Sequence, residues 1–103
     1  MKYYVLYGQS PVECKDLLTW AKWVKTANRC VAHDEQDGVS VSTSFLGLDH
    51  CFDGGGPPVL FETMIFGGPH DRDLERYCTW EEAEAGHAEM CAKAFSQSNA
   101  EDE

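Results

Sequence analysis

The eight residues "VLFETMIF", numbers 59–66, decide the expected fold. Alternate residues of a strand point to opposite faces of a sheet, and here both sets are mainly apolar. A strand that is apolar on both faces is typical of a sheet interior with cover on each side. We therefore predict that residues 59–66 form a central strand. Glu62 is the exception among these side chains, and it is expected to need a polar partner.

Extended segments lie on both sides of this strand in the sequence. "KYYVLYG" is rich in tyrosine and valine, which favour strands, and it ends at Gly8. Residues 28–47 contain two extended runs separated by Asp37-Gly38, a pair that supplies the positive φ angles of tight hairpin turns. "LERYC", residues 74–78, is expected to add one more short strand.

Two helices are predicted from capping-box patterns. In "SPVE", Ser10 is the expected N-cap, Pro11 the first helical residue and Glu13 the reciprocal partner, so a helix is predicted over 11–25. In "TWEE", Thr79 and Glu82 start a second helix that is expected to end near residue 95. Six residues of this second helix form one predicted inward stripe: Trp80, Ala83, His87, Met90, Cys91 and Ala94.

These elements predict a single α+β domain in the order β-α-β-β-β-β-α. The expected sheet is mostly antiparallel, has four or five strands and is accompanied by two helices. The chain has 103 residues, which is a common size for one core. We expect the domain to occupy residues 1–95 and residues 96–103 to form an acidic, disordered tail.

The formal charge of −10 is unevenly distributed along the chain. Residues 1–30 carry five basic and two acidic side chains, whereas residues 31–103 carry three basic and sixteen acidic ones. An acidic surface repels phosphate, so direct nucleic-acid binding is not expected. Basic protein partners are favoured instead. An inhibitor that mimics nucleic acid with residues 81–103 is an alternative.

The five cysteines are widely spaced and form no C-x-x-C motif, so neither a zinc knuckle nor a redox pair is indicated. The N-terminal apolar run is too short for the core of a signal peptide. No segment approaches the length of a membrane span. We therefore expect a cytoplasmic protein with reduced thiols and no membrane association.

A metal site is one hypothesis for the 48–58 loop and the turn that follows the central strand. Asp49, His50 and His70, with His87 as a further candidate, could form an open zinc site that activates water. Seven residues considered for this site are all chemically capable ligands: Asp49, His50, Cys51, Asp53, His70, Asp71 and His87. No pair of histidines has helical i, i+4 spacing, so a protein without a cofactor is the preferred expectation.

Three further residues are candidates for polar pairing or partner contact. If the second helix covers the right face of the central strand, Glu62 and His87 would form a buried pair. Such a pair is either an acid–base dyad or, as we favour, a polar contact that fixes the docking of the helix. Trp23 beside Lys22 and Lys25 is a candidate partner contact. Its alternative position is folded over a strand edge.

Three motifs carry a resemblance to known proteins: "FLGLDH" (45–50), "GGGPPVLFETMIFGG" (54–68) and "RYCTWEEAEAGHAEM" (76–90). In this order they resemble a family of small proteins encoded by bacteria, prophages and bacteriophages. The resemblance covers about residues 38–92. It implies a bacterial or phage setting and no catalytic role.

The function predicted from these observations is protein–protein interaction by a small, non-catalytic cytoplasmic protein, either monomeric or homodimeric. One alternative is a metal-binding protein or metal-assisted hydrolase that uses Asp49, His50 and His70. The other alternative is the acidic inhibitor described above.

Overall fold

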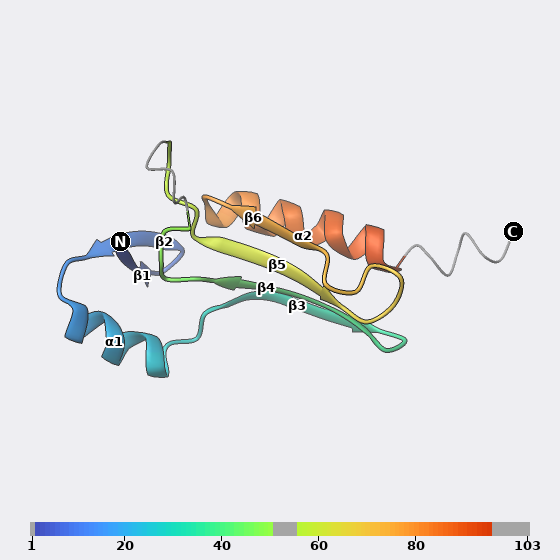
Figure 1. Ribbon diagram of the computed structural model, residues 1–103, viewed down its shortest axis with the longest axis horizontal. Coiled ribbons are helices and arrows are strands. Elements are labelled where there is room, and N and C mark those ends of the chain that lie inside the picture. Colours follow the sequence, from blue (N-terminus) through green and yellow to red (C-terminus); the bar gives the residue numbers. More distant parts are fainter. Residues whose placement is uncertain (1, 51–55, 96–103) are drawn as a thin grey trace, which may run out of the picture.

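The computed structural model describes residues 2–50 and 56–95 (Figure 1). The described chain contains six strands and two helices. In chain order these are β1 (Tyr3–Tyr7), β2 (Ser10–Cys14), α1 (Leu17–Thr26), β3 (Cys30–Gln36), β4 (Val39–Phe45), β5 (Phe61–Phe66), β6 (Leu74–Tyr77) and α2 (Trp80–Phe95). The α+β class predicted from the sequence is confirmed.

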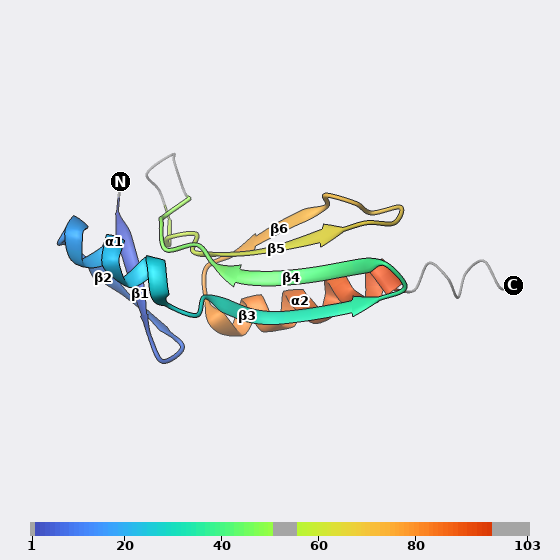
Figure 2. The ribbon, with the colours of Figure 1, turned by 90° about the horizontal axis from the view of Figure 1, so that it is seen from below.

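The main sheet has four antiparallel strands in the order β3-β4-β5-β6. Strand β5 lies between β4 and β6, so the segment that decided the expected fold is an interior strand as predicted. Thr63 pairs with Thr43 on one side and with Glu75 on the other. Helix α2 lies along one face of this sheet, as Figure 2 shows.

The hairpin between β3 and β4 forms as the sequence predicts. Asp37 and Gly38 have φ angles of 53° and 83°, which are the left-handed values that a two-residue hairpin turn requires. The turn fixes the register, with Gln36 opposite Val39 and Asp34 opposite Val41. Because Val41 faces α2, Asp34 is also on the α2 side of the sheet.

The predicted helix over residues 11–25 is wrong in its first turns. Residues 10–14 form β2, which pairs with β1 so that Tyr7 lies opposite Ser10. Gly8 has a φ of 65° and closes this tight turn. Pro11 is tolerated because β2 is an edge strand, where a missing backbone donor costs little. The element order is therefore β-β-α-β-β-β-β-α.

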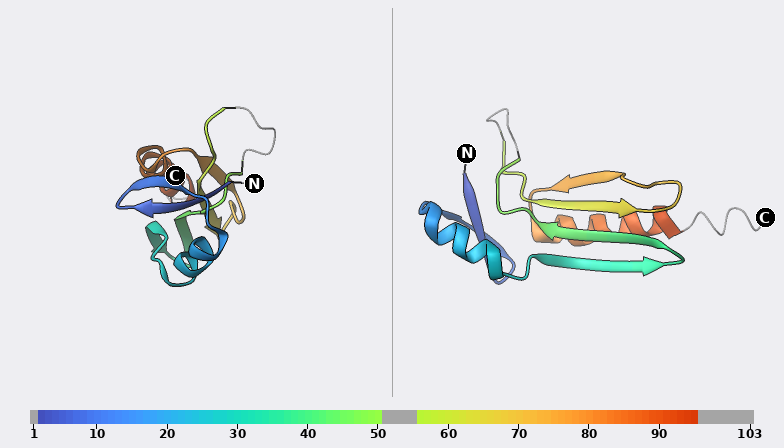
Figure 3. Two further views of the ribbon diagram at one scale, coloured as in Figure 1. Left: turned by 90° about the vertical axis from the view of Figure 1, so that its left-hand side faces the viewer. Right: turned by 60° about the horizontal axis from the view of Figure 1, so that its bottom comes forward.

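Helix α1 begins after Asp16 instead of Ser10. The Asp16 carboxylate accepts a hydrogen bond from the Leu18 backbone amide at 3.1 Å and one from the Thr19 hydroxyl at 2.7 Å. Trp20 attaches the helix to the rest of the molecule, because its Nε1 donates to the carbonyls of Tyr4 and Gly47, both at 3.1 Å. Helix α1 thus lies beyond one end of the main sheet (Figure 3).

The core lies between α2 and the main sheet. Alternate residues of β4 and β5 face the helix and are fully buried: Val41, Thr43, Phe45, Phe61, Thr63 and Ile65. On the opposite face, Glu62 and Met64 are half-buried and Phe66 is 48% exposed. The expectation that this strand has cover on each side is therefore wrong for the second face in the described part of the chain. Of the described helices, neither α1 nor α2 combines the length and the apolarity needed to cross a bilayer.

Candidate functional site at the junction of β3 and α2

The position of α2 is set by the capping box that the sequence predicts. The Glu82 amide donates to the Thr79 hydroxyl at 3.1 Å, and the Glu82 carboxylate accepts from the Thr79 amide at 3.3 Å. The helix therefore starts at Trp80, and its inward face follows from that start. His87 is on this face and is only 5% exposed. Cys91 follows one turn later, beside His87.

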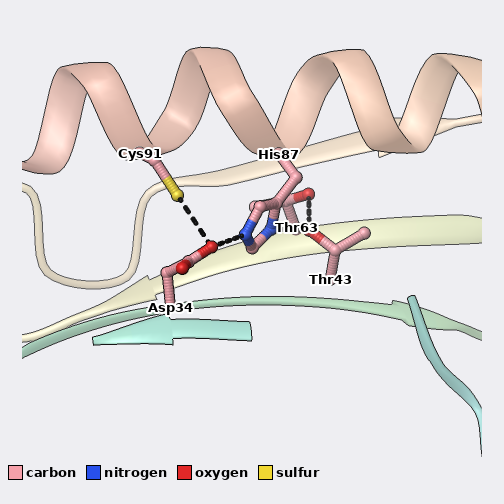
Figure 4. A network of polar contacts seen from close by, with 5 residues as sticks. All are labelled: Asp34, Thr43, Thr63, His87 and Cys91. Carbon is pink, nitrogen blue, oxygen red and sulfur yellow. Dashed lines mark hydrogen bonds and ion pairs between the residues drawn. The ribbon is translucent and has the colours of Figure 1, made fainter. Parts of the chain in front are cut away.

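His87 is the centre of a polar cluster that joins α2 to the sheet (Figure 4). Its Nδ1 lies 2.6 Å from the hydroxyl of Thr43, which in turn contacts the hydroxyl of Thr63. Its Nε2 lies 2.8 Å from the carboxylate of Asp34, which projects from β3. The Cys91 thiol donates to the same carboxylate oxygen at 3.7 Å. The cluster therefore connects three strands to one helix.

Every polar atom of the His87 ring has a partner, which allows the ring to be buried. With a neutral ring, Nε2–H donates to Asp34 and Nδ1 accepts from the Thr43 hydroxyl. With a protonated ring, Nδ1–H donates to Thr43, whose hydroxyl then donates to Thr63. The same arrangement of heavy atoms serves both states, so the two threonines accommodate either one.

The cluster changes the acidity of its two outer members in opposite directions. The hydrogen bond from His87 is the main cause that lowers the pKa of Asp34, although that carboxylate is largely exposed. Burial is the main cause that raises the pKa of Cys91 to about 11, and the adjacent Asp34 charge adds to it. The thiol is therefore protonated at neutral pH and is a poor nucleophile as it stands.

The buried part of this cluster does not present a catalytic set to solvent. Thr43 and Thr63 are fully buried, so neither hydroxyl can reach a substrate. The exposed part is different, because Asp34 has 60% of its side chain accessible and Cys91 is half-buried. The arrangement supports two chemical roles, namely docking of α2 on the sheet and coordination of a cation at its outer edge.

The predicted pair of Glu62 and His87 does not form. The two side chains lie on opposite faces of the main sheet, because α2 covers the face that contains Thr63 and not the one that contains Glu62. Glu62 pairs instead with Arg76, whose Nε lies 3.0 Å from its carboxylate. His87 contacts Asp34 instead, and the docking role favoured for it stays a prediction.

The predicted metal ligands Asp49, His50 and His70 are not brought together. The Asp49 carboxylate accepts from the Val59 amide at 3.0 Å, which places it at the start of β5. His70 lies in the turn after β5, where its Nδ1 is 3.2 Å from Asp73. The six residues of β5 separate the two groups by about 20 Å at the usual strand rise. Cys51 and Asp53 lie outside the described residues.

Trp23 is not the exposed contact that was predicted. Its ring packs edge-on against Phe45, with centroids 5.9 Å apart, and joins the cluster of Phe45 and Phe61. Trp23 folds back onto the core, but it does so at the end of the interior strand β4 and not over a strand edge, which was the alternative. Leu18 is the side chain that α1 exposes instead, at 72%.

Of the polar cluster, only His87 was predicted as a site residue, and Asp34, Thr43, Thr63 and Cys91 were not. The sequence does carry a signal for one of them, because His87 and Cys91 have the i, i+4 spacing of two ligands on one helix face. Asp34 has no such signal. Its position depends on the register of β3, because a one-residue shift would move the Asp34 side chain to the other face of the sheet.

A groove of about 610 Å³ runs between β6 and α2, at the opposite edge of the sheet from Asp34. Its charged lining residues are Glu75, Arg76, Glu82, Glu89 and Lys93. Glu81 and Glu84 are also exposed on α2. The inhibitor that mimics nucleic acid remains a prediction, and most of its acidic tail, 96–103, lies outside the described residues.

Comparisons of the chain with protein-family models, with curated proteins and with solved structures find no match. The resemblance to bacterial and phage proteins therefore remains a prediction from the motifs.

Proposed function

We propose that this chain is a non-catalytic protein-binding module and that the outward face of α1 is its contact surface. The observation that carries the proposal is the exposure of Leu17 and Leu18, at 52% and 72%, on a helix with no buried residue. A helix that is held in place yet leaves its leucines in water has an unused apolar face. Such a face is suited to the groove of a partner protein.

Helical spacing defines this α1 face. Ala21, Lys22 and Lys25 follow Leu18 at intervals of three, four and seven residues, so they lie on the same side of the helix. The opposite side contains Trp20 and Trp23, which pack against Tyr3 and Phe45. Partner binding therefore would not need to disturb the contacts that hold α1 on the molecule.

Charge on the α1 face favours an acidic partner. Lys22 and Lys25 are exposed, and residues 1–30 have three more basic than acidic side chains. A symmetric dimer of this chain through the α1 face is disfavoured, because the lysines of one copy would then face those of the other. We propose that Leu18 enters an apolar pocket of the partner while the lysines contact carboxylates at its rim.

A cytoplasmic setting is part of the proposal. It is supported by the cysteines of the described residues, since Cys14, Cys30, Cys78 and Cys91 are all free thiols. Free thiols of this kind persist where the environment is reducing.

The test compares which proteins of a bacterial lysate are retained by three immobilised forms of the full chain: the wild type, Leu18→Ser and Phe66→Ser. Phe66→Ser is the matched control, because it removes an exposed apolar side chain from the open sheet face instead of α1. We expect an acidic protein to be retained by the wild type and the control and to be lost with Leu18→Ser.

The captured protein is then purified and titrated with each form by calorimetry. We expect a one-to-one complex that Leu18→Ser weakens roughly tenfold, the equivalent of about 1.4 kcal/mol, and that added salt weakens further. Loss of binding with Phe66→Ser alone would show that the partner contacts the open face of the main sheet, and it would overturn the proposal. Self-association of the wild type, with no other protein retained, would also overturn it.

A further inference from the structure

We propose that Asp34, His87 and Cys91 form a binding site for a divalent cation of the zinc class. The carboxylate oxygen of Asp34, Nε2 of His87 and the sulfur of Cys91 all lie within 4.8 Å of one another. Oxygen, imidazole nitrogen and thiolate sulfur are the three ligand types that zinc takes in proteins. Binding of the ion would displace the proton of the Cys91 thiol to solvent, because a zinc-bound cysteine is a thiolate. A mixed set with one carboxylate does not suit calcium or magnesium, which require several oxygen ligands.

Two of the three distances between ligand atoms are close to those of a tetrahedral site. Zinc bonds of about 2.0–2.3 Å place neighbouring ligand atoms roughly 3.3–3.8 Å apart. The oxygen of Asp34 is 3.7 Å from the Cys91 sulfur, within that range, and 2.8 Å from Nε2 of His87, which is slightly short. A shift of about half an ångström by Asp34 would bring its oxygen into this range from Nε2, and an exposed side chain on an edge strand can make that shift.

Two of the ligands are already oriented. His87 and Cys91 are one helical turn apart on α2, so their spacing does not depend on a flexible loop. The Thr43 hydroxyl is bonded to Nδ1 of His87, so it can accept from Nδ1–H and leave Nε2 free for the ion. A hydrogen bond at the second ring nitrogen is what protein zinc sites use to fix the ring.

The site would have an open coordination position. Three protein ligands leave the fourth position of a tetrahedral ion to water or to an exogenous group. That position would face solvent, because Asp34 is exposed at the sheet edge while His87 closes the inner side. The site is separate from the α1 surface and does not depend on the proposed function.

The test uses the full chain without an affinity tag, freed of metal, with Co²⁺ as a spectroscopic substitute for Zn²⁺. We expect a charge-transfer band from thiolate to cobalt that saturates at one equivalent and disappears when zinc is added. Cys91→Ser should remove the band. Cys30→Ser is the matched control, since Cys30 is an exposed thiol of β3, and it should retain the band.

A second variant and a second measurement make the test decisive even if Cys91→Ser does not fold. Asp34→Asn changes an exposed side chain, and it should weaken Zn²⁺ affinity at least tenfold in a competition titration. Zinc should also raise the thermal midpoint of the wild type more than that of Asp34→Asn. No charge-transfer band, a band retained by Cys91→Ser, or equal zinc affinity in wild type and Asp34→Asn would each overturn the proposal.

Discussion

The main sheet with α2 and the N-terminal unit of β1, β2 and α1 differ in how their apolar residues are used. The first region contains every fully buried apolar side chain of the described chain, including Phe45, Phe61 and Ile65. The second has none in its helix and exposes Leu17 and Leu18. Stability is therefore concentrated in the first region. The second region has apolar surface left for a partner.

The largest expected change in the free energy of unfolding comes from a substitution in the core of the main region. Phe61→Ala removes a fully buried ring that contacts Phe45 and Trp80, so it should destabilise the protein by about 3–5 kcal/mol. Leu18→Ala should change stability by less than about 0.5 kcal/mol, because that side chain is exposed. Urea unfolding of both variants measures the difference. Similar losses of unfolding free energy in the two variants would contradict the difference between the two regions.

The next effect concerns the close contact of α2 with β6. A Cβ added at Gly86 would lie 2.2 Å from the ring of Tyr77, so Gly86→Ala should cost about 1–3 kcal/mol through overpacking. Helix propensity alone predicts the opposite, a gain of about 1 kcal/mol. Gly86→Ala in a Tyr77→Ala background is the control, and there the gain should appear. A stabilised Gly86→Ala single variant in urea unfolding would contradict the observed contact.

A smaller, local effect is expected where the N-terminal unit is attached. Trp20→Phe keeps an aromatic ring against Tyr3 but removes the donor to the carbonyls of Tyr4 and Gly47. The substitution should lower the free energy of unfolding by about 0.5–1.5 kcal/mol. It should shift the amide resonances around Gly47 while those of β5 stay in place. Shifts spread over the whole main sheet would indicate that the two regions are not separate.

The smallest expected effect is a dependence of the stability of α1 on pH. The hydrogen bond from the Thr19 hydroxyl, followed by that from the Leu18 amide, lowers the pKa of Asp16. Because the pKa of Asp16 is lower in the folded state, it contributes stability at pH values above its unfolded-state pKa of about 3.9. That contribution is lost as the pH falls through its folded-state pKa. The start of α1 should therefore loosen in acid, below about pH 4.

The Leu18 amide resonance follows this transition directly, since that amide donates to Asp16. Asp16→Asn is the control, because asparagine also caps helices and does not titrate. If the Leu18 amide titrated identically in Asp16→Asn, the transition would not belong to Asp16.

The sequence predicts the main region well because its local signals agree with its long-range contacts. The turn at Asp37-Gly38, the capping box at Thr79 and the apolar run 59–66 all point to the observed sheet and helix, although only one face of that strand is covered. Local and global preferences agree at these positions, as they do in stable folds.

The N-terminal unit is predicted less well because its local signals compete. The residues around Ser10 and Pro11 can start a helix, but pairing of all five β2 residues with β1 takes precedence. The partner of His87 is missed for another reason. Periodicity shows that β5 has two faces, but it does not show which face α2 covers, so Glu62 was expected where Asp34 is found.

Residue-resolved amide exchange of the wild-type protein tests the central difference between the two regions most directly. We predict that the slowest amides are those of β4 and β5, including Thr43 and Thr63, and exchange only through global unfolding. The α1 amides should exchange faster, through local opening of the N-terminal unit. Equal protection of α1 and β5, or rapid exchange throughout β5, would contradict the account.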